Sequence, residues 1–149
     1  MNNGISNILI PKSEEEIIRD LHKLNKRELS IHLHTSAERG YFNLVKILIS
    51  AGANINYKDD YSWPVLTVAV YRSNKHIVQY LIENGANINA KRSDGETPLI
   101  LATRYHLVDM VDLLLKCGAN MNIKDNSGFS ALYYVDVDSR LSGVFQKYK

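Results

Sequence analysis

The amino-acid sequence predicts an all-α solenoid, in which helix-turn-helix units stack side by side and are joined by β-hairpin-like loops. The first observation behind this prediction is a pentapeptide, Gly-Ala-Asn-x-Asn, that begins at Gly52, at Gly85 and at Gly118, so that its copies lie 33 residues apart. The second observation is a stripe of apolar residues that precedes each copy at the same offset. A fixed period of this length is typical of stacked repeats, whose units bury their apolar faces against their neighbours.

The first predicted element is a helix from Glu14 to Leu24. Ser13 and Glu16 have the spacing of a capping box, in which each side chain binds the backbone N–H of the other residue. The apolar residues of this helix share one face and are Ile17, Ile18, Leu21 and Leu24. We expect the helix to cover the first repeat as an N-terminal lid, because a terminal repeat needs a cap over its apolar face. Residues 1–10 are expected to be loose.

Each repeat is predicted to contain two helices. The second helix has apolar residues at positions i, i+1, i+4 and i+5, which lie on one helix face. These residues are Leu44, Val45, Leu48 and Ile49, then Ile77, Val78, Leu81 and Ile82, then Met110, Val111, Leu114 and Leu115. The helix is expected to end at the following glycine, which adopts a left-handed conformation without steric cost. The first, shorter helix is marked by leucines 33 residues apart, namely Leu33, Leu66, Leu99 and Leu132.

The last predicted element is a short helix over residues 139–148. Its apolar residues are Leu141, Val144, Phe145 and Tyr148, and the polar residues expected to face outward are Asp136, Asp138, Arg140 and Gln146. We expect this helix to close the C-terminal end of the stack. With both ends capped and the apolar stripes accounted for by stacking, the sequence predicts a monomer.

The third repeat contains a motif with a family resemblance. Residues 94–99 read Asp-Gly-Glu-Thr-Pro-Leu, with Thr97 as the expected N-cap and Pro98 in the first helical turn. Together with the Gly-Ala-Asn corner, this motif resembles the ankyrin repeat family. The resemblance implies an ankyrin-repeat solenoid over residues 26–149, with repeats at about 26–58, 59–91, 92–124 and 125–149, after an N-terminal tail and capping helix over residues 1–25.

Two repeats depart from the family pattern. The second repeat has Tyr61-Ser62-Trp63-Pro64 where the family has Asp-Gly-x-Thr, so that its proline comes one position early. The fourth repeat begins with the expected residues 125–132 and then loses the pattern. We therefore expect a weaker turn in the second repeat and a degenerate, capping last repeat.

Composition bounds the class of protein. The chain has 149 residues, a net charge of +2 and one cysteine, Cys117. It contains no run of about 18 apolar residues, so no membrane span is expected, and its N-terminus lacks the basic and apolar segments of a secretory signal. A lone cysteine fits a reducing compartment, and we expect a cytoplasmic protein. The small net charge argues against nucleic acid as the partner.

The sequence lacks the patterns that catalysis or cofactor binding requires. Neither a phosphate-binding glycine loop nor a Gly-x-Ser-x-Gly nucleophile elbow is present. His32 and His34 are two residues apart on a helix and point in different directions, and the resemblance gives His34 a structural role. Asp109 and Asp112 are expected to face water, and Cys117 is expected to be an unreactive thiol. We therefore predict no enzyme activity, no catalytic residue, no cofactor and no metal.

The functional prediction concerns a binding surface. The resemblance implies that a partner protein docks on the concave face, which we define as the hairpin tips together with the exposed sides of the first helices. Aromatic and arginine residues, which dominate interface hot spots, gather at these positions. The candidate partner-binding residues are Tyr61, Trp63, Tyr71, Arg72, Glu96, Arg104, Tyr105 and Phe129. The sequence thus predicts a non-catalytic protein–protein interaction module whose partner it does not identify.

Alternatives remain for these residues and for the function. Trp63 could instead pack on the neighbouring hairpin, and Tyr71 and Tyr105 could stack on adjacent first helices. A binding role predicts that Trp63→Ala lowers affinity with little change in melting temperature. The basic residues Lys58, Lys91, Lys124, Arg72 and Arg104 favour a partner with acidic or mixed groups. A nucleic-acid or other ligand binder that uses the same basic and aromatic face is the alternative function, and an enzyme ranks below it.

Overall fold

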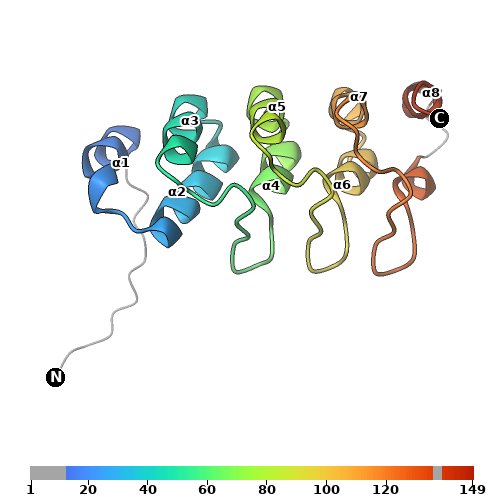
Figure 1. Ribbon diagram of the computed structural model, residues 1–149. Helices are drawn as coiled ribbons and strands as arrows, with labels where there is room; N and C mark the ends of the chain where they lie inside the picture. Colours follow the sequence, from blue (N-terminus) through green and yellow to red (C-terminus); the bar gives the residue numbers. More distant parts are fainter. Residues whose placement is uncertain (1–12, 136–138) are drawn as a thin grey trace.

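The described residues form a row of helix pairs. The structure is a computed structural model that describes residues 13–135 and 139–149, so the expected loose segment 1–10 and the acidic residues Asp136 and Asp138 lie outside it. Figure 1 shows one layer of first helices and one layer of second helices, with three hairpin loops projecting beyond the first layer. The first helices are α2 (Lys26–Arg39), α4 (Val65–Tyr71) and α6 (Pro98–Arg104), and the second helices are α3 (Phe42–Ser50), α5 (Lys75–Glu83) and α7 (Val108–Lys116). The predicted all-α solenoid is confirmed.

The N-terminal helix α1 (Glu14–Asp20) begins with the predicted capping box. Glu16 N donates to Ser13 Oγ at 3.2 Å, and Ser13 N donates to Glu16 Oε2 at 2.9 Å. The helix is shorter than expected, because a 3₁₀ turn, η1 (Leu21–Lys23), follows it. Ile17 is buried in the common core, whereas Ile18 is exposed, so the prediction that both face the core is wrong for Ile18.

A second capping box, absent from the sequence analysis, starts α2. Glu28 N donates to Asn25 Oδ1 at 3.0 Å, and Asn25 N donates to Glu28 Oε2 at 2.8 Å. The N-termini of α1 and α2 are therefore both capped by side chains that satisfy otherwise unpaired N–H groups.

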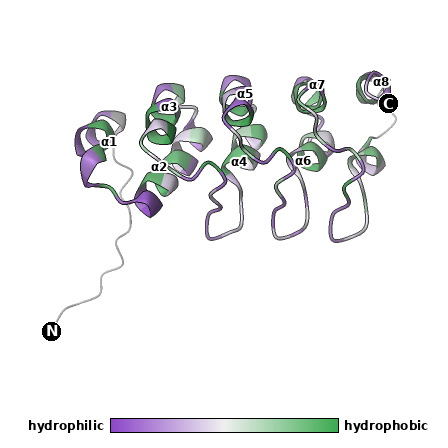
Figure 2. Ribbon diagram, in the orientation of Figure 1, coloured by the Kyte–Doolittle hydropathy of each residue, from purple (hydrophilic) through white to green (hydrophobic). Residues whose placement is uncertain are grey.

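The apolar stripes pack between the two helix layers. The residues at positions i, i+1 and i+4 of each second helix are buried, as predicted, and Figure 2 shows hydrophobic residues on the facing sides of the helices. Each second helix ends in the same motif. Gly52 N donates to Ile49 O and Ala53 N donates to Leu48 O, and the bonds repeat at Gly85 and Gly118, where φ is again positive. This geometry satisfies the last carbonyl groups of the helix and explains the Gly-Ala pair.

The asparagines of the pentapeptide link one repeat to the next. Asn56 Oδ1 accepts the N–H of Asn87 at 2.8 Å, and Asn89 Oδ1 accepts the N–H of Asn120 at 2.9 Å. Within each corner, the first asparagine accepts the N–H of the second at about 3.0 Å, as Asn54 does for Asn56. The chain of bonds begins at Ser30 Oγ, which accepts the N–H of Asn54. The second asparagine of the first two pentapeptides, Asn56 and Asn89, is therefore an inter-repeat acceptor.

The C-terminal end is closed by a 3₁₀ turn, η2 (Ala131–Tyr134), and by helix α8 (Ser139–Gln146). The predicted first helix of the fourth repeat is thus reduced to η2, which agrees with the loss of its sequence pattern. Leu141, Val144 and Phe145 are buried in the core, as predicted. Tyr148 lies just beyond the helix, and its hydroxyl donates to Asp112 Oδ1 at 3.2 Å.

Candidate functional site

The three hairpins share one turn geometry, which places Trp63, Glu96 and Phe129 at equivalent positions. The N–H of Asp59 donates to the carbonyl of Trp63, and the same bond joins Arg92 to Glu96 and Asp125 to Phe129, at 2.9–3.1 Å. Ser62 has φ of 62°, in the position where Gly95 and Gly128 have positive φ in the other hairpins. The hairpin of the second repeat therefore forms the common turn although its sequence departs from the family pattern.

Three aromatic side chains form a continuous row, which we call the aromatic row: Trp63, Tyr71 and Tyr105. The rings of Trp63 and Tyr71 lie 5.4 Å apart at 68°, and those of Tyr71 and Tyr105 lie 5.4 Å apart at 78°. Such edge-to-face pairs are the arrangement that ring quadrupoles favour. Trp63 is partly buried against the core, whereas Tyr71 and Tyr105 are exposed. The structure thus brings three predicted site residues together across two repeats.

Glu96 does not lie on the exposed surface, which corrects its assignment as a contact residue. It is only 2% exposed, and its carboxylate receives Arg104 at 2.7 Å and Arg92 at 3.2 Å. Burial raises the pKa of Glu96, and the positive charge of Arg104 opposes this shift. Buried carboxylates require such partners because desolvation disfavours the charged form. Glu96 therefore positions two arginines, and the guanidinium of Arg92, absent from our prediction, stacks on Trp63 at 4.0 Å.

The basic residues of the concave face are largely engaged within the protein. Lys58 Nζ donates to the carbonyl of Lys91 at 2.7 Å, and Lys91 Nζ donates to that of Lys124 at 2.9 Å, so these lysines join successive hairpins. Arg72 pairs with Glu38 of the preceding repeat at 2.6 Å. Arg72 and Arg104 thus have carboxylate partners within the stack, whereas Lys58 and Lys91 bind neutral carbonyls and keep their net charge.

Phe129 lies in a separate cluster at the C-terminal end, with Tyr133 and Tyr134. Its ring stacks on that of Tyr133 at 3.8 Å, and Tyr134 donates to Asp125 Oδ2 at 2.6 Å. This bond lowers the pKa of Asp125 and raises that of Tyr134 to about 12. The sequence analysis missed both tyrosines, although they stand where buried Ile100 and Leu101 stand one repeat earlier. Aromatic residues at core positions of a terminal repeat were the available signal.

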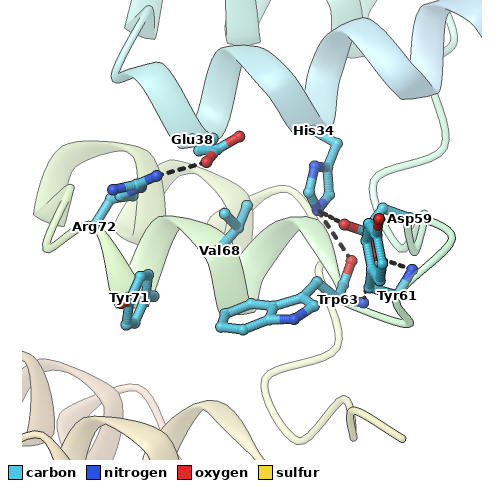
Figure 3. A pocket seen from close by; sticks show the side chains of 8 residues that line it. All are labelled: His34, Glu38, Asp59, Tyr61, Trp63, Val68, Tyr71 and Arg72. Atoms are coloured by element: carbon cyan, nitrogen blue, oxygen red, sulfur yellow. Dashed lines mark hydrogen bonds and ion pairs between the residues drawn. The ribbon is translucent and has the colours of Figure 1, made fainter.

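A cavity of about 190 Å³ opens between α2, α4 and the hairpin of the second repeat (Figure 3). Its aromatic lining consists of Tyr61, Trp63 and Tyr71, and its carboxylates are those of Glu38 and Asp59. His34 Nε2 lies 3.1 Å from the carbonyl of Trp63, which gives this histidine the structural role that the resemblance implied. The cavity therefore combines ring faces with the carboxylates of Glu38 and Asp59 and the guanidinium of Arg72.

The other predicted chemical candidates are spread over the second helices. Asp109 is exposed and pairs with Lys75 at 2.8 Å, and Asp112 interacts with Lys147 and Tyr148. Burial raises the pKa of Cys117, which leaves the thiol less ionised than usual at neutral pH. Within residues 13–135 and 139–149, no group of three or more His, Cys, Asp or Glu side chains is arranged to hold a metal ion.

Comparison with known proteins agrees with the architecture. A family model described as ankyrin repeats (3 copies) matches residues 5–92 and residues 33–125. No curated protein sequence matches the chain significantly. In the part of the chain that the structure describes, every helix is too short or too polar to cross a membrane.

Proposed function

The chain belongs to the ankyrin repeat family, and we propose that it is a non-catalytic module that binds a partner protein through its concave face. Repeats of this family generally serve protein–protein interaction. A stack of repeats offers an extended, preformed surface, so a partner docks on it without a large ordering cost in the module itself.

The observation that carries this proposal is the exposure of aromatic residues along the concave face. Tyr61 is 80% exposed, Tyr105 48% and Tyr71 40%, although the leucine, valine and isoleucine side chains of the core are almost fully buried. Tyr71 and Tyr105 also lie beside Arg72 and Arg104, whose guanidinium carbons are 5.7 and 5.3 Å from the respective ring centroids. Exposed tyrosine and arginine in one patch is the composition of interface hot spots.

The internal engagement of the basic side chains also favours a protein over a nucleic acid. A phosphate backbone is bound by free cationic groups that release counterions. On this face Lys58, Lys91, Arg72 and Arg104 already contact carbonyl or carboxylate oxygens.

The test is affinity capture from a lysate of the source organism or its host with wild-type protein and two variants. The concave-face variant is Tyr61→Ala/Tyr105→Ala, which spares the partly buried Trp63. The control is Tyr41→Ala, since Tyr41 is 38% exposed but lies at the turn between α2 and α3. We expect a protein that wild type and the control retain and the concave-face variant loses. Equal recovery by all three would refute the concave face as the docking surface.

The same proposal includes the organisation of the chain. We assign residues 26–149 to the repeat domain and residues 1–25 to a tail and capping helix, which the burial of Ile17 at the N-terminal end supports. We further propose a monomer, because α1 and α8 cover the two ends of the stack (Figure 1), and a cytoplasmic location, which the single cysteine favours. Sedimentation and fractionation measurements test these two assignments.

A further inference from the structure

The cavity beside Trp63 has aromatic walls that attract cations. Tyr61, Trp63 and Tyr71 line it, and the negative faces of such rings bind ammonium and guanidinium groups. Trp63 already holds one guanidinium, that of Arg92 from the next hairpin, at 4.0 Å. Arg92 is not among the residues that line the cavity, so the part of the indole that faces the cavity is not covered by it.

The cavity also carries negative charge. Asp59 Oδ1 accepts the N–H groups of Tyr61 and Trp63, at 3.0 and 2.7 Å, which fixes the carboxylate at the cavity wall. Its Oδ2 lies 3.8 Å from His34 Nε2, but that nitrogen is closer to the carbonyl of Trp63 at 3.1 Å. The hydrogen bond of His34 Nε2 is thus to the carbonyl of Trp63 and not to the carboxylate of Asp59.

The second carboxylate, Glu38, is shared with the one cation that lines the cavity. Its partner Arg72 lies 2.6 Å away, and about half of each side chain is exposed, so water competes with the pair. Glu38 and Asp59 together outnumber Arg72 in the lining. Asp60 adds a further negative charge in the adjoining depression, which Glu38 and Asp59 also line and where Arg27 opposes it.

We propose that this cavity receives an arginine side chain of the partner protein. The inference rests on the proposed function, because it assumes a protein docked on the concave face. The planar guanidinium packs against the ring surfaces of Tyr61, Trp63 and Tyr71 that line the cavity and donates to the carboxylates of Asp59 and Glu38, in exchange for part of the Arg72 contact. Arginine suits this site better than lysine, because it combines ring stacking with bidentate hydrogen bonds to a carboxylate.

The fluorescence of Trp63 makes the cavity directly observable, since it is the only tryptophan of the chain. Heptapeptide pools serve as probes, each with one fixed central residue, arginine, lysine, citrulline or leucine, and random flanking residues. We expect the arginine pool to change the Trp63 emission at a concentration about fivefold below that of the leucine and citrulline pools. Added salt should weaken the binding of the arginine pool and leave the binding of the leucine pool unchanged.

Two variants and one control locate the effect. Asp59→Asn keeps an oxygen for the two backbone N–H groups and removes the charge, and Tyr61→Ala removes a ring that is 80% exposed and whose loss spares the fold. Each variant should lower the affinity for the arginine pool at least threefold. Glu83→Gln, which makes an equal change of charge on helix α5, should leave this affinity unchanged. Circular dichroism confirms folding of each variant.

Tighter binding of the leucine pool than of the arginine pool would overturn the inference. Binding of the arginine pool that neither Asp59→Asn nor Tyr61→Ala weakens would also overturn it. Failure of every pool to change Trp63 emission would overturn it as well. None of these results decides the proposed function, because capture of a whole partner by the wild-type protein does not require a heptapeptide to bind in this cavity.

Discussion

The guanidinium of Arg92 stacks on the indole ring of Trp63, with Arg92 Cζ 4.0 Å from the ring centroid. The two residues belong to neighbouring hairpins, and Arg92 is held in place from the other side by Asp94 and Glu96, at 3.1 and 3.2 Å. The contact therefore joins the second repeat to the third, at a point where the hairpin of the second repeat lacks the turn sequence of the family.

From this contact we expect Trp63→Ala to lower the stability of the fold. The variant loses a cation–π contact, an edge-to-face contact with Tyr71 and partly buried surface, together about 2 kcal/mol. Tyr61→Ala, on the same hairpin but largely exposed, should change stability by less than about 0.5 kcal/mol. Urea unfolding of both variants provides the measurement. Equal midpoints would return Trp63 to a purely surface role.

Gly95→Ala should destabilise the protein strongly. Gly95 has φ of +82°, and a Cβ there would lie 2.4 Å from Asn126 Oδ1 and 2.6 Å from the backbone N of Asn126. The left-handed conformation alone costs about 1–2 kcal/mol, and the collision with the next hairpin adds to it. The matched control is Gly143→Ala, because Gly143 lies within α8 with open space around it. There alanine should raise stability by about 0.5–1 kcal/mol, and a loss comparable to that of Gly95→Ala would contradict the argument.

His106→Gly should stabilise the protein. His106 has φ of 54° at the turn between α6 and α7, where the first repeat has Gly40 with φ of 79°. Relief of the left-handed conformation recovers about 1–2 kcal/mol, and the extra freedom of glycine in the unfolded chain offsets about half of it. Thermal melting should show a higher midpoint for His106→Gly and a lower one for His76→Gly, which places glycine inside helix α5. A lower midpoint for both would refute the claim.

Asn89→Ala should weaken the link between the second and third repeats. Its Oδ1 accepts the N–H of Asn120 at 2.9 Å, and this acceptor disappears in the variant. We expect a loss of about 1 kcal/mol and faster deuterium exchange at the amide of Asn120. Asn43→Ala, at an exposed position of α3, serves as the control and should not reduce stability. Unchanged exchange at Asn120 would show that water replaces the asparagine without cost.

Tyr134→Phe should raise the pKa of Asp125. The hydroxyl of Tyr134 is the main cause that lowers this pKa below 3.8, and the N–H groups of Phe129 and Ser127 contribute less. The pKa should therefore move toward 3.8 without reaching it, as followed by the chemical shift of the carboxyl carbon. Because the folded-state pKa is the lower one, the stabilisation is present above pH 3.8 and is lost as pH falls through the folded-state value. The difference in melting temperature between wild type and Tyr134→Phe should accordingly shrink in acid, and a constant difference would contradict the assignment.

The repeat architecture was predictable because it depends on local chemistry. The capping roles of Ser13 and Thr97 involve residues three positions apart, and the helix ends at Gly52, Gly85 and Gly118 follow from bonds within one turn. The burial of the helix stripes follows from a periodicity that any stacked helix must satisfy. These features depend on residues that are close together in the sequence.

The candidate surface was predicted less completely, because its contacts join residues about 33 positions apart. The sequence identified Trp63, Tyr71 and Tyr105 as neighbours on one face, but it placed Glu96 among the exposed residues. The fold of one repeat brings Arg104 onto Glu96, and only the stacking of repeats brings Arg92 onto Trp63 and Lys58 onto the carbonyl of Lys91. Which charges remain free for a partner depends on the spacing and rotation between successive repeats, and tertiary packing sets both.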